Sequence, residues 1–446
     1  MRRKFLLAAA GGLVLVVAGL VTGWFVFVDR SAPQGALDTD LEGVTTLRPP
    51  KPKKPTPPPP PPPKEIVERP CWNEFGGDPQ RSLSRVSIQL GPPTKPLWAR
   101  AMGSYMEYPP SFCDGRLYVN TYAGRTVALD AGTGKVLWQR GGRGAKASSP
   151  AIAGPRLIVS SHDGSVTALD RANGQVLWRV KLSAKVESSP VAIGNTVYFG
   201  ATDGRVFAVN ASTGAVRWAY DTGGRINSSP SVYGDRLCVS TYAGSIFCLD
   251  REDGTKLWSR YFKRDFFRYE SFYASPSTDG LRVFAVSRSG RVYAMRARDG
   301  KRLWTGSVGG LGYTTPAVAA GRVFVGGFDG ALRAYRATTG RELWRRYVAG
   351  RILGAAVVVG NLVFFSTLET NTYAARVADG KIVWRIGLGK YSPGIATDRH
   401  YYFSLNGMLI AYRGRNSPPE PKVTADGDGG AKAGRRGRPK RRRSKP

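Results

Sequence analysis

Cysteine and histidine are scarce in this chain, which limits the chemistry that its side chains can perform. The 446 residues include four cysteines and two histidines, His162 and His400. No Cys-x-x-Cys spacing occurs, so a zinc site of that type has no support. His162 falls in a turn, where a solvated side chain is expected. Neither histidine has an identifiable partner for a catalytic triad or a two-histidine metal site.

Two of the cysteines are placed to form a disulfide. Cys238 and Cys248 flank the turn Tyr242–Gly244 on two successive strand-like segments, which puts them opposite each other. At the equivalent positions of other repeats a bulky residue faces an alanine, so two cysteines there favour a cross-strand bridge in an oxidising compartment. Two reduced buried thiols are the alternative. Cys71 and Cys113 would pair with each other by elimination, joining the lead-in segment to the first repeat.

The carboxylates recur with the repeat and do not gather at one site. Asp130, Asp170 and Asp250 each precede a turn glycine by four residues. An acidic residue that recurs in this way usually caps a turn by accepting hydrogen bonds from the backbone. No carboxylate stands apart as a member of a metal cluster. The sequence therefore predicts neither a metal site nor a catalytic acid.

Eight tryptophans mark the framework that must position all these side chains. They follow one another at 40-residue intervals, apart from a single interval of 46 residues. A fixed period of this length indicates one supersecondary unit that is copied and stacked, because a single unit cannot bury its own apolar face. These structural tryptophans are Trp98, Trp138, Trp178, Trp218, Trp258, Trp304, Trp344 and Trp384.

Each repeat reads as four short strands. Residues 148–178 contain four strand-like segments separated by glycine turns, without a helical period. Four strands per repeat predict a blade of a β-propeller. Seven copies end in their own tryptophan, and an eighth, residues 393–413, supplies only three strands. The N-terminal strand Pro96–Trp98 completes that blade, so we expect an all-β, eight-bladed propeller over residues 71–413 in which this strand closes the ring.

The repeat resembles a known family. Ala128–Trp138 follows the pattern A-x-D-x-x-T-G-x-x-x-W of the quinoprotein-type (PQQ-like) propeller repeat, and Trp72–Asp78 resembles the lead-in to its first blade. The resemblance covers about residues 72–413. It implies a fold shared by dehydrogenases, which hold pyrroloquinoline quinone over a metal ion, and by the non-catalytic propellers of the outer-membrane β-barrel assembly machinery, which dock partners.

The enzyme alternative lacks its expected parts. This chain has no adjacent cysteines, which many quinoprotein dehydrogenases carry, and it is shorter than those enzymes, whose blades bear long insertions. We therefore expect no enzymatic activity and no cofactor, with pyrroloquinoline quinone the only cofactor that the resemblance implies.

The N-terminal region predicts a membrane anchor. Residues 5–28 are uncharged and follow Arg2, Arg3 and Lys4. A helix of this length spans about 36 Å, enough to cross a bilayer, and exceeds the roughly 7–15 apolar residues of a cleaved signal peptide. Residues 1–4 would then be a cytoplasmic stub, with everything beyond the single-pass anchor extracytoplasmic. The anchor replaces the lipidated cysteine of the assembly propellers, which leaves a role in barrel assembly open to doubt.

Two further segments lack the composition of a folded core. Residues 29–70 form a linker whose Pro57–Pro63 run is typical of stiff polyproline II. The tail, residues 414–446, carries 11 Lys and Arg against 3 Asp and Glu and is predicted to be disordered. Its Arg436–Lys440 segment looks like the core of an AT-hook, but nucleic acid is not an expected partner of an extracytoplasmic tail.

Positive charge extends over the whole protein. The formal net charge is +34, and residues 71–413 alone hold 45 Lys and Arg against 23 Asp and Glu. The loops between blades carry a cation shortly before the next blade, which would place positive charge around one rim and attract anions. Solvated loop charge is the alternative. The rim residues are Lys146, Lys185, Arg225, Arg351 and Lys390.

The insertion between Trp258 and Trp304 is the second candidate binding element. Residues 262–273 contain six aromatic residues and three cations, an unusual composition for a solvated loop and one that interfaces favour. Packing beneath the rim or into the channel is the equal alternative. The best exposed candidates are Phe266, Phe267, Arg268 and Tyr269.

These observations favour a monomeric, membrane-anchored propeller at the cell envelope that acts as a non-catalytic docking scaffold for envelope proteins. The first alternative is a binder of anionic wall polymer through the basic rim and tail. The second is a quinone-dependent dehydrogenase.

Overall fold

The structure is a computed structural model that describes residues 71–418, except residues 143, 264, 266–268, 370, 392 and 406. The predicted anchor at residues 5–28, the linker to residue 70 and the tail from residue 419 lie outside the described residues. Within the described part of the chain, no helix is long and apolar enough to cross a membrane.

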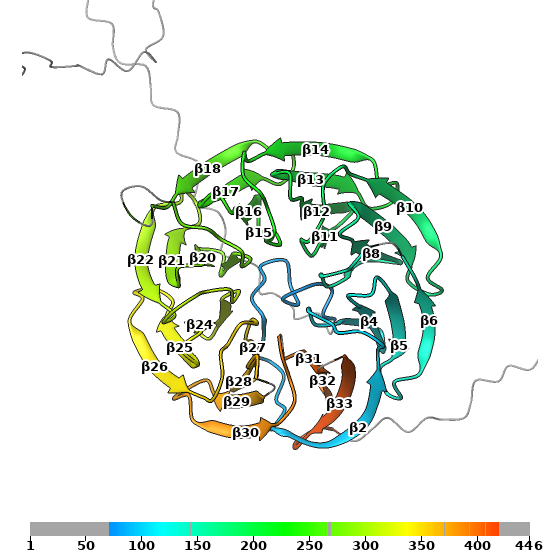
Figure 1. The fold of residues 1–446 in the computed structure, drawn as a ribbon, viewed down its shortest axis with the longest axis vertical. Helices are drawn as coiled ribbons and strands as arrows, with labels where there is room; N and C mark the ends of the chain where they lie inside the picture. The colour runs from blue at the N-terminus through cyan, green and yellow to red at the C-terminus, as the bar shows by residue number, and fades with distance from the viewer. Residues whose placement is uncertain are drawn as a thin grey trace, which may run out of the picture. The chain divides into compact units, whose positions relative to one another are not determined.

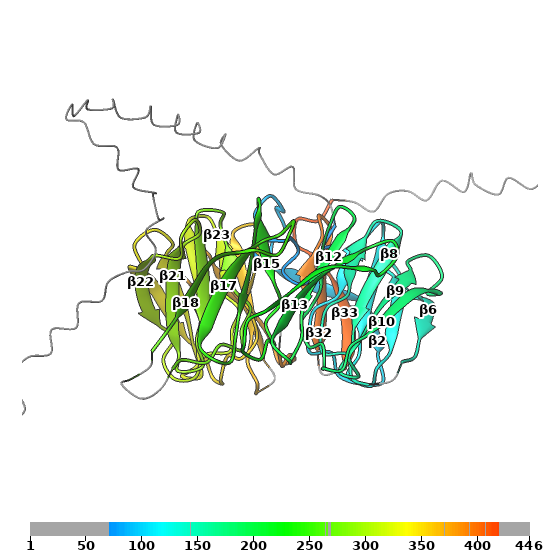
Figure 2. The same cartoon turned by 90° about the horizontal axis from the view of Figure 1, so that it is seen from above.

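The described chain forms an eight-bladed β-propeller, as predicted (Figure 1). Each blade is an antiparallel sheet whose first strand lies nearest the axis and whose fourth strand lies outermost (Figure 1). Figure 2, turned by 90°, shows these strands crossing the thickness of the ring. The side chains of the second and third strands are almost entirely buried, whereas the fourth strands alternate between exposed and partly buried.

The strands of the first four blades have these bounds. The blades are β3 (Ser111–Cys113), β4 (Arg116–Asn120), β5 (Thr126–Asp130) and β6 (Val136–Arg140); β7 (Ala151–Ala153), β8 (Arg156–Ser160), β9 (Ser165–Asp170) and β10 (Val176–Lys181); β11 (Val191–Ile193), β12 (Thr196–Gly200), β13 (Arg205–Asn210) and β14 (Val216–Asp221); and β15 (Ser231–Tyr233), β16 (Arg236–Ser240), β17 (Ser245–Asp250) and β18 (Lys256–Tyr261).

The remaining blades follow the same order. They are β19 (Ser277–Thr278), β20 (Arg282–Val286), β21 (Arg291–Arg296) and β22 (Arg302–Ser307); β23 (Ala317–Ala319), β24 (Arg322–Gly326), β25 (Ala331–Arg336) and β26 (Glu342–Tyr347); β27 (Val357–Val359), β28 (Leu362–Ser366), β29 (Thr372–Arg376) and β30 (Ile382–Ile386); and β31 (Ile395–Ala396), β32 (His400–Leu405), β33 (Met408–Gly414) and the N-terminal β2 (Pro93–Ala101).

The N-terminal strand closes the ring. β2 pairs antiparallel with β33, with Trp98 opposite Ala411, and becomes the fourth strand of the last blade. The first and last parts of the propeller thus share one sheet, which leaves no open blade edge between them. The predicted closure is confirmed, with a strand longer than the Pro96–Trp98 segment seen in the sequence.

The periodic tryptophans join each blade to the next. The indole of Trp218 donates a hydrogen bond to the Arg251 carbonyl, 3.1 Å away, in the turn of the following blade. Gly254 of the same turn adopts φ +78°, and a Cβ there would lie 2.6 Å from the Trp218 ring. The same pair recurs from Trp98 with Gly134 to Trp344 with Gly380. The shared period of tryptophan and glycine is therefore a contact between blades.

A second interblade contact surrounds the axis. The backbone N–H of Ser149 donates to the Ser189 hydroxyl at 3.0 Å, that of Ser189 to Ser229 at 2.9 Å, and that of Ser229 to Ser275 at 2.8 Å. The N–H of Ser275 continues the series to the Thr315 hydroxyl at 3.2 Å. Each hydroxyl precedes the innermost strand of its blade, so five consecutive blades share one belt of hydrogen bonds.

The segment before β2 occupies the axial channel. Trp72–Leu83 passes from blade to blade and accepts hydrogen bonds from the central N–H groups of the innermost strands. Asn73, Pro79, Gln80, Ser82 and Leu83 supply the carbonyls, at 2.7–3.0 Å from the N–H groups of Ile152, Val232, Thr278, Val318 and Val358. Trp72 pairs with Phe112, and β1 (Ser84–Arg85) lies parallel to β27. We call Trp72–Arg85 the plug. It gives the innermost edges their partners.

Arg81 is the charged centre of the plug. Its side chain is fully buried and donates to the carbonyls of Pro230 at 2.8 Å, Ser189 at 2.9 Å and Pro190 at 3.2 Å. Glu74 is also buried, and burial is the main reason that its pKa is raised to about 7, although Arg81 opposes the shift. The guanidinium of Arg81 therefore joins the plug to two neighbouring blades.

Two disulfides are present. Cys238 on β16 lies directly opposite Cys248 on β17, at the register that the turn between them predicts. Cys71 is joined to Cys113 at the end of β3, which attaches the plug to the first blade.

Candidate functional site: the mouth of the axial channel

The two faces of the propeller differ in what they carry. The loops between blades and the turns between second and third strands meet on one face. There the backbone N–H of Thr202 donates to the Lys185 carbonyl, and that of Tyr242 donates to the Arg225 carbonyl, each at 2.9 Å. We call this the mouth face. Cys71 and Arg415 lie instead beside turns between first and second strands, at Gly194 and Asn361, so the described chain enters and leaves on the opposite face.

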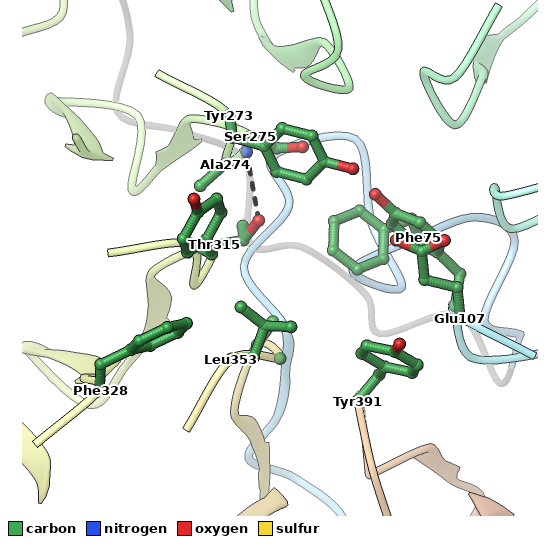
Figure 3. A pocket seen from close by; sticks show the side chains of 13 residues that line it. Phe75, Glu107, Tyr273, Ala274, Ser275, Thr315, Phe328, Leu353 and Tyr391 are labelled. Atoms are coloured by element: carbon green, nitrogen blue, oxygen red, sulfur yellow. Dashed lines mark hydrogen bonds between the residues drawn. The ribbon is translucent and has the colours of Figure 1, made fainter. Parts of the chain in front are cut away.

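A cavity of about 370 Å³ opens at the channel mouth (Figure 3). Phe328 and Tyr391 lie on opposite sides of it, with Leu353 between them, and Phe75 of the plug is also part of its wall (Figure 3). Six of its lining residues are aromatic: Phe75, Tyr108, Tyr273, Tyr313, Phe328 and Tyr391. A volume and lining of this kind fall within the usual range of small-molecule sites.

One position of the repeat supplies much of the lining. It is the residue four places before each innermost strand, which the interblade loop aims at the axis. Around the ring these residues are Glu107, Ala147, Glu187, Asn227, Tyr273, Tyr313, Leu353 and Tyr391. Five of them line the cavity. The ring is therefore aromatic or aliphatic from Tyr273 to Tyr391, and small or polar over the other half.

Glu107 is the charged residue of the cavity. Burial, followed by the negative charge of Glu187, raises the pKa of the Glu107 carboxyl to about 7. No described residue donates a hydrogen bond to this carboxylate, and its pKa shift has no opposing contribution from a cation. Glu187, by contrast, pairs with Arg225 at 3.3 Å and accepts a hydrogen bond from Asn227. A partly buried carboxyl without a partner in a cleft marks a candidate binding group.

The aromatic lining continues onto the surface. Tyr105 stacks on Tyr122 with 4.5 Å between ring centroids and lies 6.5 Å from Tyr391. Tyr105 is 41% exposed and Tyr122 is 38% exposed. On the other side Tyr242, Tyr273, Tyr313 and Phe328 contact one another in sequence. We call Tyr105, Tyr122, Tyr242, Tyr273, Tyr313, Phe328 and Tyr391 the aromatic arc.

The predicted rim of positive charge is present in part, since Lys185, Arg225, Arg351 and Lys390 are exposed in the interblade loops and Lys146 is not. Lys146 is buried and its ammonium donates to the Gly124 carbonyl, and burial lowers its pKa to about 8. Arg225 pairs with Glu187 at 3.3 Å and Arg351 pairs with Glu369 at 2.8 Å. Lys185 and Lys390 are exposed. Three of the five cations are therefore held by carbonyl or carboxylate groups of neighbouring loops and turns.

The insertion divides between the two expected roles. Phe262 and Phe272 are buried and pack against each other and against Tyr293, which supports self-packing for this half. Tyr273 faces the cavity, and Tyr269 is 54% exposed. Phe266, Phe267 and Arg268 lie outside the described residues. Glu270 anchors the loop by accepting hydrogen bonds from the hydroxyls of Ser289 at 2.8 Å and Tyr293 at 3.1 Å.

The other chemically capable side chains have structural surroundings. Asp130 accepts from the N–H of Thr133 at 2.8 Å and Asp170 from that of Ala172 at 2.8 Å, so the repeated aspartates cap turns as predicted. His162 lies on the mouth face against Tyr122, whereas His400 is buried in β32 beside Tyr402. Cys71, Cys113 and Asp114 are close together. The two cysteine sulfurs form a disulfide, and in that state they do not ligate a metal.

Comparison with known proteins settles the family. The sequence profile described as "Outer membrane protein assembly factor BamB" matches residues 84–265 and 243–392, which is more than half of the chain. The chain belongs to this family of PQQ-like propellers. No curated protein matches the sequence.

Solved structures show how widely this fold is used. BamB from Moraxella catarrhalis is 16% identical, with a TM-score of 0.61 over 73% of this chain and 99% of that one. The quinohemoprotein alcohol dehydrogenase from Comamonas testosteroni is 15% identical, with a TM-score of 0.65 over 80% and 82%. The computationally designed Ika8 protein is 14% identical, with a TM-score of 0.63 over 72% and 100%. At these identities the likeness concerns the fold alone.

The cavity does not fit pyrroloquinoline quinone, the cofactor that the family resemblance implies. That quinone carries three carboxylates, and no lysine or arginine is among the described residues that line the cavity. Its one charged lining group among the described residues is the Glu107 carboxyl, whose ionised form is already disfavoured by burial and then by Glu187. A trianionic ligand would add to this repulsion.

Proposed function

We propose that the protein is a non-catalytic docking scaffold of the cell envelope, held at the membrane by residues 5–28 with its propeller outside. Membership of the BamB family is consistent with this function. The single observation that carries it is the position of the aromatic arc. It lies on the mouth face, opposite the face where the described chain begins and ends. The mouth face is therefore clear of the points where the described chain begins and ends.

The chemistry of the aromatic arc suits a protein interface. Exposed tyrosines offer large contact areas with little conformational entropy to lose, and tyrosine and arginine are enriched at interface hot spots. Arg288 lies over both Tyr242 and Tyr313, and Arg351 lies over Phe328. These contacts restrain the rings before any partner binds, which lowers the entropic cost of docking.

Photo-crosslinking in intact cells tests this function. A photoreactive residue replaces Tyr122 on the mouth face or, as the matched control, Leu281, which is 68% exposed in the β19–β20 turn of the opposite face. We expect discrete crosslinked envelope proteins from position 122 and few from position 281. Equal capture at both positions, or no capture at 122, would contradict docking through the mouth face.

Binding of anionic wall polymer is the second candidate, favoured by the excess of 45 Lys and Arg over 23 Asp and Glu in residues 71–413. It predicts an affinity that falls steeply with salt and is lost when residues 419–446 are removed. Because Arg225 and Arg351 are paired with carboxylates, the rim would contribute less to the binding of such a polymer.

A further inference from the structure

The mouth cavity has a feature that protein docking does not require. Glu107 is a partly buried carboxyl in a chamber walled by aromatic rings, and no described residue supplies a cation or a hydrogen-bond donor to it. Burying a carboxylate without a partner is costly, because the protein does not replace the hydration that the ion loses. Positive charge brought into the cavity would therefore favour the ionised form of Glu107.

The walls suit a cation that also carries apolar surface. Aromatic faces attract cations through their quadrupole, and cages of several rings are the usual recognition device for methylated ammonium groups. Tyr273, Tyr313, Phe328 and Tyr391 converge on the cavity, with Leu353 and Ala355 adding aliphatic surface. The hydroxyls of Ser275 and Thr315 offer polar contacts deeper in the cavity.

We infer that the mouth cavity binds a small organic cation, an alkylated ammonium ion whose charge pairs with Glu107 and whose methyl or methylene groups contact the tyrosine rings. The volume of about 370 Å³ accommodates an ion of this kind. This inference does not depend on protein docking, since the ligand would enter the cavity itself.

A basic side chain of a partner protein has similar chemistry, and the charge distribution argues against it. The propeller carries an excess of positive charge, and the mouth face bears exposed Lys185, Lys390 and Arg225. A basic protein segment would bring many charges against this field, whereas a monovalent ion brings one. The small ion is therefore the favoured ligand.

Titration calorimetry on the detergent-solubilised full chain tests the inference. The probe is choline, and the control ligand is 3,3-dimethylbutan-1-ol, its uncharged carbon isostere, at matched ionic strength. Because a caged cation gains about 1–2 kcal/mol over a neutral group, we expect choline to bind about tenfold more tightly. Equal affinities, or no detectable binding of choline, would overturn the inference.

The second measurement uses Glu107→Gln, with Glu252→Gln as a control of equal charge change at an exposed position. We expect choline affinity to rise between about pH 6 and pH 8 in the unchanged protein, because the carboxyl ionises over this range. Glu107→Gln should weaken binding about tenfold and remove the pH dependence, and Glu252→Gln should do neither. Identical behaviour of the two variants would contradict the assignment.

A lysine-containing peptide, Nα-acetyl-Gly-Lys-Gly-amide, separates the two sources of positive charge. Binding of choline with at most weak binding of the peptide supports the small-ion site. Binding of the peptide without binding of choline would refute it and would point to a basic partner segment.

Discussion

Arg81 in the plug donates a hydrogen bond from its Nε to the carbonyl of Pro230, 2.8 Å away, although 149 residues separate them in the chain. The same guanidinium reaches Ser189 and Pro190, so one side chain at the axis holds carbonyls of two blades that are not joined to it by any sheet. The closed ring therefore depends on a segment that belongs to none of its blades.

Removing this guanidinium should strongly destabilise the propeller. Arg81→Met would leave four carbonyls without their donor and remove a positive charge near the buried Glu74, and we expect a loss of about 3–5 kcal/mol in the free energy of unfolding. Denaturant unfolding followed by tryptophan fluorescence measures it. Arg140→Met, at an exposed position, should cost less than about 0.5 kcal/mol. Equal stability of the two variants would show that the plug does not support the ring.

A pair of glycine substitutions isolates the contact between tryptophan and glycine. Gly254 and Gly234 both have positive φ, at +78° and +57°, but only a Cβ at position 254 would meet the Trp218 ring, whereas nothing lies within 4 Å at position 234. Gly234→Ala should cost about 1 kcal/mol through its backbone alone. Gly254→Ala should cost about 2–4 kcal/mol, because the indole must also move. Similar losses would mean that the blades are not joined in this way.

The two disulfides should contribute unequally to stability. Cys71–Cys113 closes 42 residues and Cys238–Cys248 closes 10. The chain-entropy relation predicts about 4 kcal/mol for the longer loop and about 3 kcal/mol for the shorter one. Double alanine variants of each pair, unfolded under identical oxidising conditions, provide the comparison. A larger loss from the 238–248 pair would be the opposite of this expectation.

Stability should also depend on pH through Glu107. Its pKa is about 7 in the folded protein and near 4.5 when unfolded, so the folded state binds more protons between these values. Stability therefore falls as pH rises from about 4.5 to 7, and the loss is complete above about pH 7. In Glu107→Gln, the difference in unfolding free energy between pH 5 and pH 8 should be smaller by on the order of 2 kcal/mol. Thermal unfolding at the two pH values measures this difference. An unchanged pH profile in the variant would exclude Glu107 as its source.

The blades could be predicted because their determinants repeat. Tryptophan and glycine recur together at fixed positions, and the structure shows that each pair is one contact between neighbours. Ring closure followed from a count of strands, since the last repeat lacked its fourth strand and Trp98 lay on an unassigned one. These inferences needed no knowledge of side-chain surroundings.

The plug and the cavity required information that single residues do not carry. Trp72–Arg85 has no period, and its contacts are made mostly by irregular backbone, so its sequence does not reveal that it crosses the channel. A signal for the cavity did exist. The residue four places before each innermost strand changes from small or polar residues at Ala147 and Asn227 to aromatic ones at Tyr273, Tyr313 and Tyr391. Aligning the repeats on their innermost strands would have shown this asymmetry.

Lys146 illustrates the opposite difficulty. It lies one position later in its loop than Lys185 and Arg225 do in theirs, at the place of the buried Val186 and Ile226, and its ammonium turns inward to the Gly124 carbonyl. Gly124 lies in a turn of the preceding blade, 22 residues away in the chain, so the contact exists only once the loop has packed against that blade.

The most direct test of the account is whether the aromatic arc holds the partners of the full-length protein in its own cells. Tyr105→Ala combined with Tyr122→Ala removes the exposed stacked pair on the mouth face, and Leu281→Ala serves as the control on the opposite face. Partners that co-purify with each form are quantified by mass spectrometry, after unfolding curves have shown that all forms are folded. We predict at least a tenfold loss of specific partners for the tyrosine variant and no change for the control. Full retention of those partners by the tyrosine variant would contradict docking through the mouth face.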